Sequence, residues 1–111
     1  MAQSIKLLVF PVRDIEEAKT FYNTFLGVQP YVDSAYYVGY RVGNDVEIGL
    51  DPNAEVGPIA YTDVADIAAS LKAMTSMGAD IVQDIHNVGN GLLIAQVKDT
   101  YGNIVGLRQQ S

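Results

Sequence analysis

Tyrosine side chains are the first candidates for chemistry in this chain, because three of them fall close together in one predicted strand. Side chains alternate between the two faces of a strand, so Tyr36 and Tyr40 share one face and Tyr37 takes the other. Two interpretations are open. The rings pack across neighbouring strands, as aromatic side chains favour, or they line a ligand groove, in which a phenol offers an apolar body and a polar tip.

Glycines inside predicted strands and the single histidine also bear on chemistry. Gly39, Gly49 and Gly106 occupy strand positions, where glycine is unfavourable and often marks a close approach or room for a ligand. His86 stands beside a predicted turn and is interpreted as a surface histidine. The alternative is a general base, although no nucleophile accompanies it. Because the chain has no cysteine, disulfides, zinc–thiolate sites and cysteine nucleophiles are excluded.

Two helices that must position these residues are predicted from their capping signals. Asp14 is a predicted N-cap with Glu17 three residues on, the spacing of a capping box. Gly27 supplies the left-handed residue that commonly follows a helix. Asp66 caps a second helix, which Gly78 closes.

Strands are predicted before and after each helix, so each half of the chain has the order strand, helix, strand, strand, strand. The sequence therefore predicts one domain, residues 1–111, made of two modules at about residues 1–52 and 57–111. The apolar and β-branched runs that predict strands are residues 5–12, 31–32, 35–42 and 46–51 in the first half, and 59–63, 80–88, 92–98 and 104–108 in the second.

Composition narrows the classes of function. The 111 residues carry 7 basic and 13 acidic side chains, a net charge of −6 that disfavours nucleic acid and anionic membranes as partners. With 49% hydrophobic and 18% charged residues, the chain is expected to bury a core. Pro11 and Arg13 interrupt the first apolar run before it reaches the length of a signal peptide or membrane span. We expect a soluble cytoplasmic protein.

Two sequence segments and the doubled βαβββ order resemble the vicinal oxygen chelate superfamily. This superfamily includes glyoxalase I, the extradiol dioxygenases, and the fosfomycin and bleomycin resistance proteins. The resemblance implies an α+β fold in which two tandem βαβββ modules form a cupped mixed sheet. The matching segments are Val12-Arg13-Asp14-Ile15-Glu16-Glu17-Ala18, followed by Phe21-Tyr22 and Leu26-Gly27, and Asp99-Thr100-Tyr101-Gly102-Asn103-Ile104-Val105-Gly106-Leu107.

The resemblance also implies where a metal would be bound. Enzymes of the family hold one divalent ion with four side chains, one from the first and one from the last strand of each module, and use it as a Lewis acid. The matching positions are Leu7, Gly49, Ile59 and Gly106, none of which has a donor atom in its side chain. The sequence therefore predicts a member of the family with no metal and no other cofactor.

Residues that share a strand face with these positions make up the predicted pocket. A residue two positions along a strand shares its face, so Glu47 accompanies Gly49 and Arg108 accompanies Gly106. The glycines indicate a cavity that is widened where the ion would sit. No catalytic residue is assigned. The predicted ligand-binding residues are Leu7, Tyr36, Tyr40, Glu47, Gly49, Ile59, Tyr61, Asp63, Gly106 and Arg108.

The resemblance favours a metal-free binding protein similar to the bleomycin resistance proteins. Such a protein would be a homodimer that holds a cationic or aromatic small molecule in the concave sheet cavity at the dimer interface. The alternative is a glyoxalase- or lyase-type enzyme with a non-standard active site. A structural or regulatory dimer without a small ligand is a third interpretation.

Overall fold

The computed structural model describes residues 3–110 and divides them into two compact units. We call residues 6–59 the N-terminal module, and residues 60–110 together with residues 3–5 the C-terminal module. The element order is strand, helix and three strands, twice, which confirms the α+β class and the doubled βαβββ pattern. Neither helix in this range is long and apolar enough to span a membrane.

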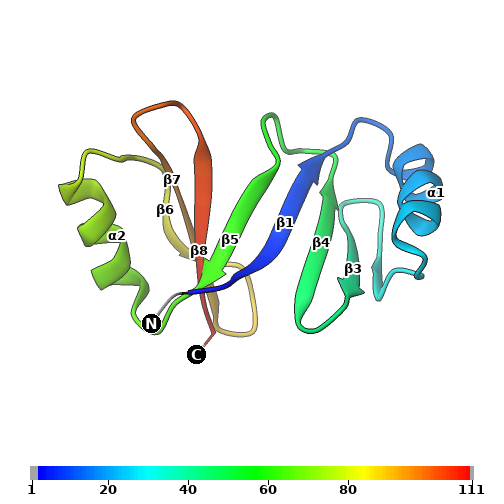
Figure 1. The fold of residues 1–111 in the computed structure, drawn as a ribbon, viewed down its shortest axis with the longest axis horizontal. Coiled ribbons are helices and arrows are strands. Elements are labelled where there is room, and N and C mark those ends of the chain that lie inside the picture. Colours follow the sequence, from blue (N-terminus) through cyan, green and yellow to red (C-terminus); the bar gives the residue numbers. More distant parts are fainter. Residues whose placement is uncertain (1–2, 111) are drawn as a thin grey trace. The chain divides into compact units, whose positions relative to one another are not determined.

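The N-terminal module is a four-stranded sheet with one helix. Its elements are β1 (Ile5–Pro11), α1 (Ile15–Leu26), β2 (Val32–Asp33), β3 (Val38–Val42) and β4 (Val46–Asp51). The strands lie in the order β2-β3-β4-β1. β1 is parallel to β4, whereas β3 is antiparallel to both β2 and β4. Figure 1 shows α1 beside β3, and the two are in contact.

The C-terminal module repeats this plan. Its elements are β5 (Ile59–Asp63), α2 (Ile67–Ser76), β6 (Asp80–Asn87), β7 (Leu92–Lys98) and β8 (Ile104–Gln110). The strands lie in the order β5-β8-β7-β6. β5 is parallel to β8, and the β8–β7–β6 ladder is antiparallel. Helix α2 packs against β6, β7 and β8 (Figure 1).

The helix ends follow the predicted capping chemistry. The Asp14 carboxylate accepts a hydrogen bond from the Glu17 N–H at 3.1 Å, and the Asp66 carboxylate accepts one from the Ala69 N–H at 3.1 Å. After α1, Gly27 has a φ of 71°, and its N–H donates to the Asn23 carbonyl. These bonds satisfy backbone groups that a helix end leaves without partners, so both helices begin where the sequence predicted.

Each helix covers one face of the sheet in its own module and leaves the other face without a helix. Under α1 the core is Val38, Tyr40, Ile48 and Leu50. Under α2 the core is Val64, Ile67, Leu71, Ala95, Val97 and Leu107. We call the opposite side of each sheet the helix-free face. Strand alternation places the residues between these core positions on it.

One strand begins later than its apolar run predicted. The predicted strand of residues 35–42 is shortened to β3, because residues 34–37 form a turn. The Ser34 N–H donates to the Tyr37 carbonyl at 3.1 Å, and the Ser34 hydroxyl accepts from the N–H groups of Tyr36 and Tyr37. Serine and its hydroxyl commonly stabilise turns in this way. Tyr36 therefore lies outside the sheet.

Candidate functional site

The helix-free face of the N-terminal module brings together three of the predicted site residues. Leu7 pairs with Glu47 across β1 and β4, and Gly49 lies two residues further along β4 on the same face. On the other side of β4, Gly39 pairs with Gly49, and Arg41 pairs with Glu47. The predicted face of Glu47 is therefore confirmed. Its role as a ligand-binding residue stays a prediction.

A tyrosine ring lies directly over Gly49. A Cβ atom built on Gly49 would stand only 2.6 Å from Cζ and 2.8 Å from Cε1 of Tyr37, and closer still to its hydroxyl. A Cβ on Gly39 would lie 3.3 Å from ring atoms of both Tyr31 and Tyr37. Glycine is thus required because the rings rest on the backbone. The expectation of a cavity widened at Gly49 is wrong, since Tyr37 fills the room that the missing side chain leaves.

Glu47 is held by an aromatic partner on the same face. The Tyr31 hydroxyl donates a hydrogen bond to Glu47 Oε1, and the Tyr31 N–H donates to the Gly39 carbonyl at 2.9 Å. The Arg41 guanidinium stacks over the Tyr31 ring, 4.1 Å from its centroid. A cation over an aromatic face is attracted by the ring quadrupole. The face therefore combines a carboxylate, two phenol rings and one stacked guanidinium.

The helix-free face of the C-terminal module repeats the glycine–tyrosine arrangement with other partners. Tyr61 on β5 pairs with Gly106 on β8, and the Tyr61 ring lies over the glycine, with Cγ 2.8 Å from the position of an added Cβ. Gln96 Nε2 donates a hydrogen bond to the Tyr61 hydroxyl at 2.7 Å. The idea of a widened cavity is wrong at Gly106 for the same reason as at Gly49.

The two charged residues predicted for this face form an ion pair. Asp63 and Arg108 are paired across β5 and β8, and Arg108 Nε donates to Asp63 Oδ1 at 2.7 Å. The Arg108 side chain is 14% exposed and that of Asp63 is 52% exposed. The Asp63 end of the pair is therefore open to water, whereas the Arg108 end is largely covered. Ile59 is buried at the start of β5 and alternates in phase with Tyr61 and Asp63.

Two predicted site tyrosines lie elsewhere. Tyr40 is fully buried under α1, where its hydroxyl donates to Asn23 Oδ1 at 2.7 Å, and burial raises its pKa. It cannot line the helix-free face, because Val38, Tyr40 and Val42 all point into the helix-side core. Tyr36 is 76% exposed in the turn before β3. The residues that sequence reasoning missed are Tyr37, which has the same strand parity as Gly39, and Tyr31.

His86, which the sequence predicted to be a surface histidine, also lies on the helix-free face of the C-terminal module. Ile85 packs against the core under α2, and the next residue, His86, is paired with Ile94 on β7. Ile94 is in turn paired with Arg108. The sequence could not reveal this neighbourhood, since β6 carries two irregularities that shift its register between Ile81 and His86.

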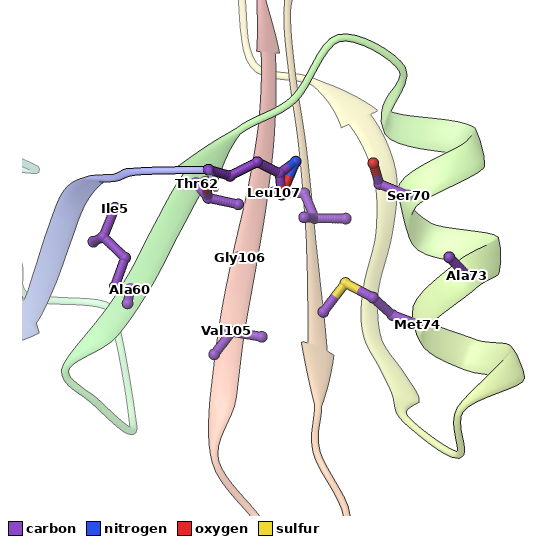
Figure 2. A pocket seen from close by; sticks show the side chains of 10 residues that line it. Ile5, Ala60, Thr62, Ser70, Ala73, Met74, Val105, Gly106 and Leu107 are labelled. Carbon is purple, nitrogen blue, oxygen red and sulfur yellow. The ribbon is translucent and has the colours of Figure 1, made fainter. Parts of the chain in front are cut away.

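The C-terminal module has a cavity of about 410 Å³, but on the helix side of its sheet, between α2 and β5 (Figure 2). Its walls are mainly apolar. In Figure 2 Ile5, Ala60 and Val105 line the strand side, Met74 points from α2 toward the strands, and the polar Ser70 and Thr62 stand at one end. Of the predicted site residues, only Gly106 contributes to this cavity. The cavity is therefore distinct from the predicted pocket.

The residues at the family's metal positions do not fit a metal ion. Leu7, Gly49, Ile59 and Gly106 offer no oxygen, nitrogen or sulfur donor, and tyrosine rings lie over both glycines. Between residues 3 and 110, no three His, Asp or Glu side chains gather into a group that could hold an ion. Divalent metals in proteins need such donors.

Comparison with solved structures shows the same fold at low sequence identity. A hypothetical protein from Bacillus halodurans C-125 aligns with a TM-score of 0.80 and 13% identity, covering 100% of this chain and 96% of that one. A glyoxalase/bleomycin resistance protein/dioxygenase superfamily member from Vibrio splendidus 12B01 gives 0.77 and 15%, covering 99% and 100%. Methylmalonyl-CoA epimerase from Mycobacterium tuberculosis gives 0.70 and 18%, covering 96% and 87%.

The sequence itself matches a family model over most of its length. No curated protein matches at a significant level. The model of the Glyoxalase/Bleomycin resistance protein/Dioxygenase superfamily, however, matches residues 4–107. The match includes both βαβββ modules and agrees with the fold of the solved structures. The chain therefore belongs to the glyoxalase/bleomycin resistance protein/dioxygenase superfamily.

Proposed function

We propose that this protein binds a small cationic or aromatic molecule on the helix-free faces of its sheets, without a resident metal. The observation that carries the proposal is that tyrosine rings lie over both glycines at metal-ligand positions of the family. Phenol rings bind aromatic groups by stacking and cations through their faces. Chelation of two substrate oxygens would instead need a metal and its donors.

The charge of the N-terminal module supports a cationic ligand. Glu47 is only partly exposed on the helix-free face, with the Tyr31 hydroxyl as a donor to one carboxylate oxygen. Arg41 over Tyr31 already makes, within the chain, the kind of cation–aromatic contact that such a ligand would make. The net charge of −6 favours the approach of cations to the protein as a whole.

The proposal includes a two-fold homodimer with the binding faces at its interface. Exposed apolar surface on the helix side of the N-terminal module supports self-association in general, since Phe21 and Phe25 on α1 stack on each other while remaining 62% and 70% exposed. Contiguous exposed apolar groups often mark a protein interface. Light scattering should give twice the 12.0 kDa chain mass at micromolar concentration. A monomer mass would contradict this part of the proposal.

A thermal-shift screen of the full chain tests the binding function. Three groups of compounds are compared: cationic glycopeptides such as bleomycin, aromatic acids, and the divalent ions of nickel, zinc and manganese. A ligand that binds only the folded state raises the melting temperature in a concentration-dependent way. Stabilisation by the cationic or aromatic compounds supports the proposal. Stabilisation by the metals alone would overturn it in favour of a metal-dependent glyoxalase- or lyase-type enzyme.

A further inference from the structure

His86 stands in a row of side chains that crosses the helix-free face of the C-terminal module. The register pairs Asp63 with Arg108, Arg108 with Ile94, and Ile94 with His86. Neighbouring strands lie about 4.8 Å apart, so His86 is about 10 Å from Arg108, with Ile94 between them. The row thus has an ion pair at one end, an apolar floor in the middle and an imidazole at the other end.

The hydrogen bond of the imidazole indicates which ring nitrogen can accept from a ligand. His86 Nδ1 lies 3.0 Å from the backbone carbonyl oxygen of Asp84. A carbonyl oxygen can only accept, so Nδ1 carries the hydrogen of the neutral ring, and Nε2 is left with a lone pair. His86 is partly exposed, so a molecule on this face can reach the ring.

A second acceptor lies beside the apolar floor, further along β7. Gln96 follows Ile94 by two residues on β7 and therefore shares its face. Its amide nitrogen donates to the Tyr61 hydroxyl at 2.7 Å. With the amide nitrogen engaged in this bond, the amide oxygen, Oε1, is the atom that can accept from a ligand.

We propose that His86 Nε2 and Gln96 Oε1 are the two hydrogen-bond acceptors with which the C-terminal module binds a planar ligand lying over Ile94. The ligand class is an aromatic amidine, guanidine or amino-heterocycle, which combines a flat apolar body with N–H donors. The charge of Arg108 does not oppose it, because Asp63 compensates that charge. This inference rests on the proposed function, since it names the ligand chemistry of one of the two helix-free faces.

The imidazole itself provides the first test, because His86 is the only histidine in the chain and its resonances need no assignment. Long-range ¹H–¹⁵N NMR of the full-length protein at mildly alkaline pH should show a protonated Nδ1 and an unprotonated Nε2. Added benzamidine, a planar N–H donor, should shift the Nε2 resonance toward lower frequency. A ring protonated on Nε2, or an Nε2 resonance unmoved by millimolar benzamidine, would overturn the inference.

Substitutions then separate this inference from the proposed function. His86→Leu should weaken benzamidine binding about fivefold, the effect of one neutral hydrogen bond. His86→Gln should retain more of the binding, because its amide oxygen can accept near the place of Nε2. Lys72→Gln, on the exposed side of α2, is the control and should bind as the wild type does.

Failure of this inference can be distinguished from failure of the proposed function. If His86→Leu binds benzamidine as tightly as the wild type while Glu47→Gln binds it more weakly, the inference fails and the proposed function stands. If His86→Leu proves unfolded, the NMR test on the wild-type protein decides alone.

Discussion

In both modules a tyrosine ring lies over a glycine of the last strand, but the two tyrosines come from different places in the fold. In the N-terminal module, the ring over Gly49 belongs to Tyr37, which lies in the turn before β3 and reaches the glycine with the far end of its side chain. In the C-terminal module, the ring over Gly106 belongs to Tyr61, directly paired with it on β5, and covers it with the near edge of the ring. The same strand position is thus covered by the hydroxyl end of a ring in one module and by the body of a ring in the other.

The charged residues of the two helix-free faces differ as well. On the N-terminal module, the carboxylate of Glu47 accepts from a phenol, and the guanidinium of Arg41 stacks on that same ring. On the C-terminal module, the acid and the base are bonded to each other, as Asp63 and Arg108. Under the proposed function, we therefore expect the N-terminal module to attract the positive charge of a ligand and the C-terminal module to accept hydrogen bonds from its N–H groups.

The largest expected effect comes from adding a methyl group to Gly106, under the body of the Tyr61 ring. Gly106→Ala should lower the free energy of unfolding by about 2–3 kcal/mol, because Tyr61 cannot move away from its paired position without disturbing β5. Gly49→Ala should cost only about 1 kcal/mol, since the tip of Tyr37 can turn aside. Urea denaturation measures both. Equal losses for the two variants would show that the rings are equally mobile.

A smaller effect is expected on ligand affinity. Glu47→Gln should weaken the binding of a cationic ligand by about 1.5–3 kcal/mol, the range for hydrogen bonds to charged groups. It should also reduce the salt dependence of binding. Asp63→Asn is the comparison on the other module, where the loss should be smaller because Asp63 acts only by compensating the charge of Arg108, and calorimetric titration measures both variants. A larger loss for Asp63→Asn than for Glu47→Gln would reverse the assignment of the modules.

A third comparison concerns the two misplaced tyrosines. Tyr40→Phe should lower the free energy of unfolding by about 1 kcal/mol, because the buried hydroxyl no longer donates to Asn23. Tyr36→Phe should leave it unchanged, since Tyr36 is exposed in a turn. Neither change should alter ligand affinity. If Tyr40→Phe weakened binding at unchanged stability, Tyr40 would belong to the site after all.

The smallest effect is a dependence of stability on pH at the turn between β7 and β8. The N–H and side-chain amide of Asn103, with the N–H of Tyr101, hold the pKa of Asp99 below its ordinary value. Because the folded-state pKa is the lower one, the stabilisation is present above the unfolded-state pKa and is lost as pH falls through the folded-state pKa. Asp99→Asn should therefore flatten the acid limb of a stability–pH curve. An unchanged acid limb would mean that the turn is held by its backbone alone.

Local signals in the sequence predicted much of this fold. Asp14, Asp66 and Gly27 act through groups three or four residues away, so capping chemistry could be read directly from the chain. Because side chains alternate along a strand, the sequence also predicted on which face of the sheet Glu47 and Arg108 lie.

The errors arose where contacts are distant along the chain. The face on which Tyr40 lies is set by packing under α1, and the spacing of the three tyrosines at positions 36, 37 and 40 does not reveal it. Tyr37 reaches from the turn before β3 to Gly49 on the neighbouring strand β4, and His86 meets Ile94 only after the register shifts of β6. Such contacts depend on strand register, which the sequence of a single strand does not contain.

Elemental analysis of the purified full-length protein after dialysis tests most directly the claim that tyrosine rings have replaced a metal at these positions. The account predicts no stoichiometric nickel, zinc, manganese or iron, and no gain in melting temperature when these ions are added back. About one ion per chain, retained through dialysis and lost in Glu47→Gln, would contradict it and would point to a metal site built from donors other than the family's usual four.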